Sequence, residues 1–245
     1  MLNDFLEALR FLTILPLPSS QKPRKDSLAR AMFFFPLAGF LIGIVSLVLF
    51  KLFQSFFPAR VANLILLAAP IVLSGGLHVD GFADFCDGFF AGKSKADTLR
   101  IMKDSRIGVC GAVGVFLLLL FKFELLQELP LKTWSFLMMM TASRWAQVIL
   151  SFYLPYAGLP GGLGEQVARK VGTRELVGAS VILFFVTLPV KGAGFFVFLG
   201  LLVFLALLGW AFQKKVGGLT GDLLGAASEM TEIFVLLLIT AMVRG

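Results

Sequence analysis

Long uninterrupted apolar stretches are the feature that most limits the folds open to this chain. One of them, from Phe195 to Trp210, contains only apolar residues and glycine. A lipid-embedded backbone must satisfy its own amide and carbonyl groups, so such stretches form helices. The chain is 58% hydrophobic and only 15% charged, a composition typical of polytopic membrane proteins rather than of soluble domains. We therefore predict an all-α fold, a polytopic transmembrane helical bundle.

The hydropathy pattern predicts six or seven spans in one domain, residues 1–245. The expected spans cover residues 32–50, 61–78, 108–127, 133–153, 175–190, 193–212 and 229–243. Residues 2–15 are amphipathic but too short and too polar to cross a bilayer. We expect them to form an N-terminal helix that lies at the membrane interface.

A first acidic segment interrupts the apolar pattern. Asp80, Asp84 and Asp87 are spaced i, i+4, i+7, so on a helix they share one face. Like charges on one face repel unless a cation neutralises them, and oxygen ligands suit Mg²⁺. We predict all three as metal ligands, with Asp80 and Asp84 also catalytic. His78, the only histidine, is either a catalytic base or phosphate contact, or a structural residue.

A second acidic segment lies near the C-terminus. Asp222, Glu229 and Glu232 also fall close to one helix face, and acids at such depth in an apolar segment are functional by default. We predict that Asp222 and Glu229 complete a one- or two-metal site with the first segment. Glu232 is expected to bind substrate or to cap the helix, and Thr220 lies on a turn that could approach a phosphate.

A cationic segment precedes the third expected span. We predict that it clamps a diphosphate, because arginine binds phosphate with two parallel hydrogen bonds; the alternative is a positive loop that only sets topology. The residues of this segment assigned to substrate binding are Arg100, Lys103, Asp104, Ser105 and Arg106, of which Asp104 could also pair with Arg106 or add a metal ligand. Arg144, inside an apolar span, needs an anionic partner, which could be Glu124, a site acid or a substrate phosphate.

The net charge of +7 is explained by membrane topology rather than by nucleic-acid binding. With the N-terminus in the cytoplasm, most Lys and Arg residues outside the spans fall on the cytoplasmic side, as the positive-inside rule requires. This orientation places both acidic segments at the cytoplasmic face. Two cysteines provide neither a disulfide framework nor a thiolate metal site.

The motifs together resemble the cobalamin synthase family, the adenosylcobinamide-GDP ribazoletransferases. The strongest is Gly-Gly-Leu-His-x-Asp-Gly-x-x-Asp-x-x-Asp-Gly at residues 75–88. Further blocks follow in order over nearly the whole chain, at residues 10–16, 36–39, 101–108, 143–144 and 218–222.

This resemblance implies a multi-pass, Mg²⁺-dependent enzyme of the bacterial inner membrane. Such an enzyme joins adenosylcobinamide-GDP to α-ribazole, or to α-ribazole 5′-phosphate, and gives adenosylcobalamin, or its 5′-phosphate, plus GMP. Its partners would be these small molecules and the lipid bilayer, with a homo-oligomer or a complex with other cobalamin-synthesis enzymes as a further expectation.

Two alternatives stay open on the sequence. A CDP-alcohol phosphotransferase of lipid synthesis is also polytopic, Mg²⁺-dependent and rich in aspartate, but the residues that follow Asp80-Gly81, including Asp84, depart from its motif. A cation-coupled transporter would use intramembrane acids as an ion path, yet here the acids gather at one face.

Overall fold

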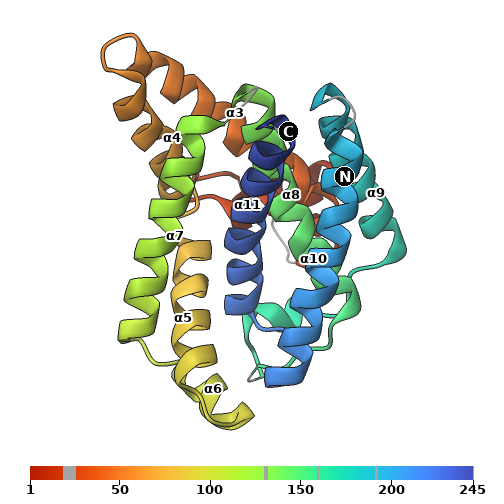
Figure 1. Ribbon diagram of the computed structural model, residues 1–245. Helices are drawn as coiled ribbons and strands as arrows, with labels where there is room; N and C mark the ends of the chain where they lie inside the picture. The colour runs from red at the N-terminus through yellow and green to blue at the C-terminus, as the bar shows by residue number, and fades with distance from the viewer. Residues whose placement is uncertain (19–25, 130–131, 159, 191–192, 245) are drawn as a thin grey trace.

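The computed structural model describes residues 1–18, 26–129, 132–158, 160–190 and 193–244. Within these residues every regular element is helical, and an isolated β-bridge joins Tyr156 and Leu219. The prediction of an all-α fold is confirmed (Figure 1).

The elements follow one another along the chain in a simple series. They are α1 (Leu2–Leu12), α2 (Ser27–Ala31), η1 (Met32–Phe34), α3 (Phe35–Gln54), α4 (Ala59–Leu73), α5 (Leu77–Ala91), α6 (Lys95–Ile101), α7 (Val109–Glu128), α8 (Lys132–Tyr153), η2 (Leu163–Gln166), α9 (Thr173–Thr187), η3 (Leu188–Val190), α10 (Ala193–Val216) and α11 (Gly221–Arg244).

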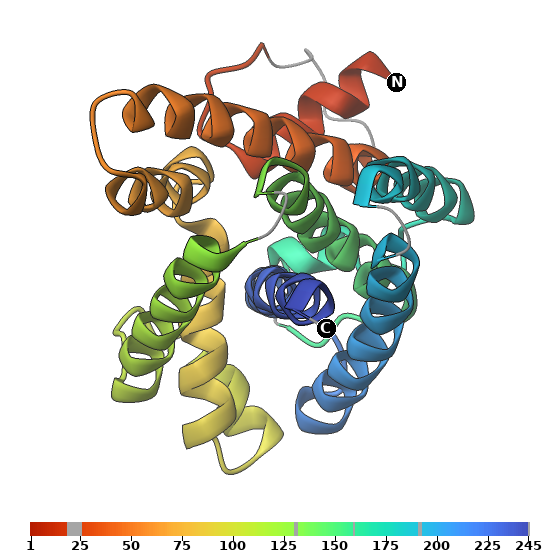
Figure 2. The ribbon, with the colours of Figure 1, turned by 45° about the horizontal axis from the view of Figure 1, so that its top comes forward.

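Helices α8 and α11 form the centre of the bundle. α11 packs against α5, α7, α8 and α10, and Figure 2 shows it surrounded by these elements. α8 packs against α11 on one side and α3 on another, and it buries most of its side chains, including Arg144 and Trp145. Polar residues on these two helices therefore face protein rather than lipid.

The bundle contains the apolar helices that a membrane protein needs. Among the described residues, Ser27–Gln54, Val109–Glu128, Gly194–Val216 and Gly221–Met242 are long and apolar enough to cross a bilayer. A fifth span results if α4 and α5 are counted together, so the number is smaller than the six or seven expected. The difference arises because α9 has only 15 residues and α8 is a central helix with a polar, buried face.

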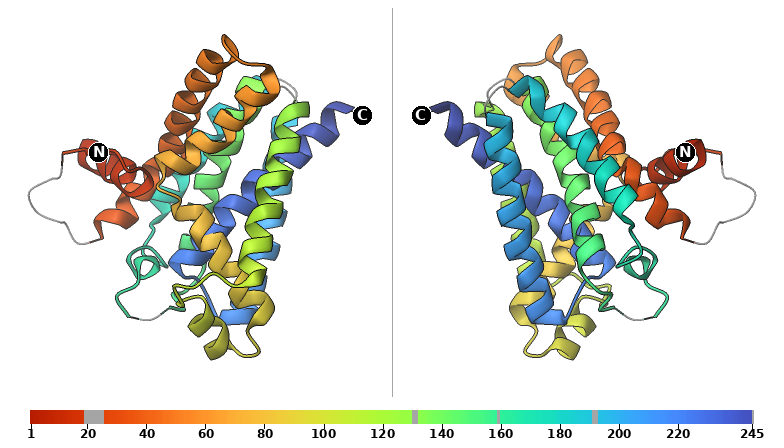
Figure 3. Two further views of the ribbon diagram at one scale, coloured as in Figure 1. Left: turned by 90° about the vertical axis from the view of Figure 1, so that its left-hand side faces the viewer. Right: turned by 90° about the vertical axis from the view of Figure 1, so that its right-hand side faces the viewer.

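The expected span 61–78 breaks at a pair of glycines. Gly75 (φ 62°) and Gly76 (φ 75°) adopt left-handed conformations that glycine reaches without steric cost, and they end α4 and begin α5. The two helix axes differ by 87°, and the left view of Figure 3 shows α5 turning away from α4. A second pair, Gly217 (φ 84°) and Gly218 (φ 154°), separates α10 from α11. Each acid-bearing helix thus follows a diglycine turn.

The N-terminal helix predicted over residues 2–15 is present as α1. It buries Ala8 and Leu12, and the ring of Phe11 stacks on Phe35 at the start of α3, with centroids 5.7 Å apart. Its expected location at a membrane interface stays a prediction.

Candidate active site

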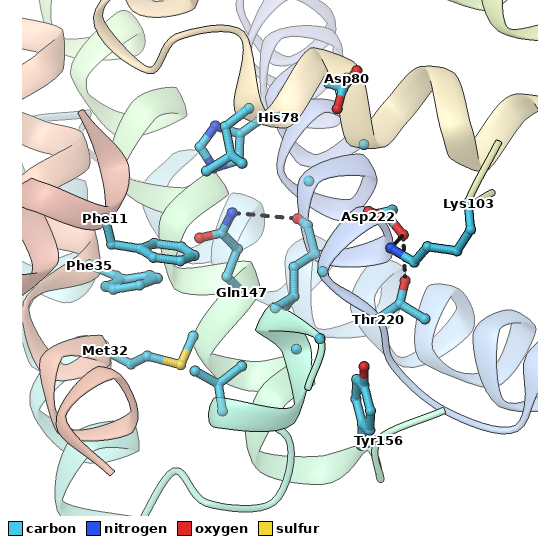
Figure 4. A pocket seen from close by; sticks show the side chains of 18 residues that line it. Phe11, Met32, Phe35, His78, Asp80, Lys103, Gln147, Tyr156, Thr220 and Asp222 are labelled. Carbon is cyan, nitrogen blue, oxygen red and sulfur yellow. Dashed lines mark hydrogen bonds and ion pairs between the residues drawn. The ribbon is translucent and has the colours of Figure 1, made fainter. Parts of the chain in front are cut away.

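A pocket lies where α5, α8 and α11 meet, close to α1 and to the loop that follows α8. It encloses about 780 Å³ of space, part of it open to solvent. Figure 4 shows Lys103 and Asp222, with Tyr156 near them, on one side of this pocket and Phe11 and Phe35 on the other. The three helices come from distant parts of the sequence, so only the folded chain creates this space.

The charged half of the pocket, defined by Asp80, Lys103, Thr220 and Asp222, joins the two acidic segments. The Nζ of Lys103 lies 3.0 Å from Oδ2 of Asp222, and the Thr220 hydroxyl lies 3.5 Å from the same oxygen. Thr220 also accepts a hydrogen bond from the amide of Leu223, at 3.2 Å, which caps the start of α11. A lysine and two carboxylates can bind a phosphate together with its cation.

The inner half of the pocket, defined by Phe11, Met32, Phe35, His78 and Gln147, is mainly apolar. His78 and Gln147 are each only 2% exposed. Within the described residues, neither ring nitrogen of His78 has a hydrogen-bond partner, and Oε1 of Gln147 accepts no hydrogen bond. Buried polar atoms without partners are rare in folded proteins, so these two side chains are available to a ligand.

Two glycines allow α5 and α11 to cross closely enough to bring Asp80 and Asp222 to one pocket. A Cβ added to Gly81 would lie 2.7 Å from the carbonyl oxygen of Asp222. A Cβ added to Gly225 would lie 3.1 Å from the carbonyl oxygen of His78. The backbone contact at this crossing therefore depends on glycine in both helices.

Asp84 lies one helical turn after Asp80, and its carboxylate interacts unfavourably with the charges of both Asp222 and Asp80. A cation among the three would relieve this repulsion, and their oxygen donors suit Mg²⁺. Across the described residues, no three carboxylate, imidazole or thiol groups converge closely enough to enclose a metal ion unaided. These acids fit Mg²⁺ as a partly open site, because Mg²⁺ usually keeps waters and takes ligands from substrate phosphates.

Asp87, on the same helix, has a different set of partners. Its Oδ2 accepts a hydrogen bond from the amide of Gly108 at 2.7 Å, and its Oδ1 accepts one from the amide of Gly111 at 2.8 Å. The side chain is 8% exposed and caps the start of α7. The structure therefore gives Asp87 a capping role; its predicted role as a metal ligand stays a prediction.

Glu229 and Glu232 lie deeper in the bundle, in a buried ionic network. The Nζ of Lys122 on α7 lies 2.5 Å from Glu229 and 2.6 Å from Glu232. Arg144 on α8 lies 3.0 Å from Glu232, and it donates to Ser228 at 2.6 Å. Arg144 thus pairs with an acid of the second segment, one of the three partners considered for it, whereas Glu124 lies 3.8 Å from Arg60.

The rest of the predicted phosphate clamp lies outside the pocket. Arg100 pairs with Asp97 at 2.6 Å. Asp104 accepts two hydrogen bonds from the Arg106 guanidinium, at 3.0 and 2.8 Å, and this pairing lowers the pKa of Asp104 to about 2. Ser105 is exposed. Lys103 is the member of this segment that lines the pocket. The substrate contacts predicted for the other residues stay predictions.

Gln147, Tyr156 and Lys122 are among the residues of this region that did not figure among the sequence predictions. Gln147 and Tyr156 line the pocket, and neither is part of a charge pattern that would have marked it. Lys122 had a usable signal, because a lysine inside an apolar span is costly unless an acid accompanies it.

Comparison with known proteins places the chain in a family. The family model of cobalamin-5-phosphate synthase matches residues 4–240. The adenosylcobinamide-GDP ribazoletransferase of Chlorobaculum tepidum is 36% identical, over 100% of this chain and 98% of the relative. Those of Desulforamulus reducens (37%, 98% and 96%) and Clostridium botulinum strain Langeland (33%, 99% and 99%) are similar over comparable lengths. The chain belongs to the cobalamin-5-phosphate synthase family.

No solved structure matches the chain. As a member of the cobalamin-5-phosphate synthase family, the protein is a transferase of cobalamin synthesis, which confirms the resemblance seen in its motifs. This assignment displaces the lipid phosphotransferase and the transporter as interpretations of the acidic segments.

Proposed function

We propose that the protein joins adenosylcobinamide-GDP to α-ribazole, or to its 5′-phosphate, and releases GMP. The names of its relatives support this reaction. The observation that carries it in this chain is the charged half of the pocket, where Asp80 and Asp222 from distant segments meet beside Lys103. Two acids and a lysine at one opening are suited to a charged diphosphate and its metal.

Mg²⁺ is the proposed cofactor, with Asp80, Asp84 and Asp222 as ligands that substrate phosphates and water would complete, because the described side chains do not enclose a metal ion by themselves. When bound, it would neutralise the diphosphate of the donor and stabilise the nucleotide that leaves. Asp87 and Glu229 have partners of their own, a helix start and Lys122, so we leave them out of this proposed ligand set.

The proposed reaction replaces a phosphoanhydride bond with a phosphate ester. A ribose hydroxyl of the acceptor other than the 5′-hydroxyl, which is already phosphorylated in α-ribazole 5′-phosphate, forms a bond to the phosphorus attached to the corrinoid arm, and the bond from that phosphorus to the GMP oxygen breaks. The proton of the hydroxyl passes to Asp84 or to His78, whose ring nitrogens are free of hydrogen-bond partners within the described residues. Lys103 holds a phosphate oxygen of the donor.

We further propose that the site faces the cytoplasm from the bacterial inner membrane. Lys215 at the end of α10 donates to the carbonyl of Gly92 beside α6, at 2.9 Å, so basic residues of two segments gather at the same end of the bundle (Figure 1). Lys103 links this end to the pocket. An excess of Lys and Arg marks the cytoplasmic side. Assembly as a homo-oligomer or with other enzymes of the pathway stays a prediction.

The test is an assay of purified protein in lipid nanodiscs with adenosylcobinamide-GDP and α-ribazole, following GMP and the corrinoid product. We expect GMP release that stops when EDTA removes Mg²⁺ and resumes when Mg²⁺ is restored. In Asp80→Asn and Asp222→Asn, kcat should fall on the order of 100-fold or more, because each removes charge that acts on the diphosphate.

Asp97→Asn is the matched control, because Asp97 pairs with Arg100 outside the pocket. Its turnover should equal that of the original enzyme. Turnover by Asp80→Asn and Asp222→Asn at the original rate would remove the charged half from the reaction.

A further inference from the structure

The proposed phosphate transfer places the diphosphate at the charged half of the pocket and leaves the inner half without a ligand. Its walls include two phenylalanines, Phe11 and Phe35, and the thioether of Met32. Figure 4 shows these residues with Gln147 on the side of the pocket away from Lys103 and Asp222. A ligand that fills the whole pocket would therefore have an apolar end and a charged end.

The aromatic residues favour a flat ligand. The rings of Phe11 and Phe35 lie 5.7 Å apart at an interplanar angle of 20°, so their faces are nearly parallel. Phe35 is 1% exposed and is fixed within the core of the bundle, so its ring supports that of Phe11, which is only partly buried. Rigid aromatic side chains of this kind provide stacking surfaces for heteroaromatic bases.

The polar atoms of the inner half limit which base fits. The side chains of His78 and Gln147 are the polar groups available there among the described lining residues. Guanine, the base of the donor, carries several hydrogen-bonding groups along its edges, and most of them would be buried without partners, at a cost in binding. The methylated benzimidazole of α-ribazole has a single free ring nitrogen and otherwise apolar edges.

We infer that the inner half of the pocket binds the aromatic base of the acceptor nucleoside, with Phe11, held in place by Phe35, as the stacking surface and Gln147 and His78 at its polar edge. This inference rests on the proposed function. It directs the ribose of the acceptor toward Asp222 and leaves the donor to enter from the charged half. Phe11 and Gln147 are then residues that determine specificity for the base.

The test compares acceptors with and without a base. Methyl riboside offers the same ribose hydroxyls as α-ribazole but has nothing to stack. In Phe11→Leu, KM for α-ribazole should rise on the order of tenfold, the size of one lost stacking contact, while KM for methyl riboside and for adenosylcobinamide-GDP stays the same. Gln147→Leu should act in the same direction, which provides a second variant if one of them fails to fold.

Phe34→Leu is the matched control, because Phe34 packs on Phe5 outside the pocket, with ring centroids 5.7 Å apart. It should leave all three KM values unchanged. Equilibrium dialysis of α-ribazole against the protein without donor adds a readout independent of turnover, and Phe11→Leu should weaken this binding by the same factor.

Two results would overturn the inference. A rise in KM for adenosylcobinamide-GDP alone would assign the inner half to guanine, and an equal rise for both acceptors would show a general loss of structure. If the original enzyme releases no GMP at all, the proposed function fails instead, and dialysis still reports whether the base binds.

Discussion

Asp87 joins two helices through a single side chain. It belongs to α5, and it accepts hydrogen bonds from the amides of Gly108 and Gly111 at the start of α7. Carboxylates are favoured at helix starts because they satisfy free amides and interact well with the helix dipole. The contribution of Asp87 to stability is thus separate from any contribution to catalysis.

Replacing Asp87 with alanine should destabilise the protein by about 1 kcal/mol, the usual cost of losing a helix cap. The measurement is thermal unfolding in detergent, followed by the fluorescence of the tryptophans. Asp80→Ala is the comparison, since Asp80 lies on the same helix but is exposed. An unfolding temperature for Asp87→Ala as high as that of Asp80→Ala would contradict the capping role.

The sequence could mark the acids but could not separate their roles. Asp222 and Glu229 fall on nearly one face of α11, yet seven residues of helix separate them by about 10 Å along the axis. That distance places Asp222 at the pocket and Glu229 beside Lys122. The spacing of residues within one helix predicts which face of the helix they share. The partner that each side chain meets depends on the neighbouring helices, which the local sequence does not specify.

At the scale of the helix, the crossing of α5 and α11 positions the two halves of the site. Gly81 and Gly225 occupy this crossing, and neither has space for a side chain without displacing the opposing backbone. Helix packing of this kind is typical of membrane proteins, where small residues let backbones approach.

Gly81→Ala should therefore move α5 away from α11, at a cost of about 1–3 kcal/mol for the overpacked contact. It should also reduce turnover, because Asp80 and Asp222 separate. Gly209→Ala is the matched control: its added Cβ would lie 3.4 Å from Leu150, an ordinary contact, and alanine favours helix. A Gly81→Ala enzyme as stable and as active as Gly209→Ala would show that the crossing tolerates a side chain.

Helix existence was predictable and helix boundaries were less so. The apolar pattern located α3, α7, α10 and α11, because lipid-facing helices have a strong compositional signal. The prediction of one span over residues 61–78 missed the break at Ser74, because glycine is common in membrane helices and does not by itself mark a turn. α8 resembled a lipid-exposed span although it is enclosed by protein.

At the scale of the whole molecule, the network of Lys122, Arg144, Glu229 and Glu232 ties α7, α8 and α11 together. All four side chains are at most 5% exposed, and their charges cancel. A buried charge that loses its partner is strongly destabilising, whereas an apolar replacement of both partners costs little.

Lys122→Met should therefore destabilise the fold by about 3–5 kcal/mol, because it leaves Glu229 buried without its cation. The double variant Lys122→Met/Glu229→Met should recover most of this loss. Chemical unfolding in mixed micelles measures both. If the double variant is less stable than the single one, the pair contributes net stability beyond the cost of an unpaired charge.

The proposed orientation predicts which end of the bundle faces the cytoplasm. In a background with Cys86→Ala and Cys110→Ala, a cysteine at Ala96 on α6 should react with a membrane-impermeant maleimide in inverted vesicles. A cysteine at Ser55, at the end of α3, should react in intact spheroplasts; both positions are exposed. The reverse labelling pattern would place the pocket on the outer side.

The two diglycine turns affect how the activities of mutants should be interpreted. Gly75 and Gly76, like Gly217 and Gly218, have backbone angles that other residues rarely adopt, and each pair sets the direction of a helix that carries an aspartate of the pocket. A mutational scan would score them as harshly as the aspartates, although they offer no functional group. In this enzyme, a residue can therefore be essential because it sets the direction of the backbone, without contributing a chemical group.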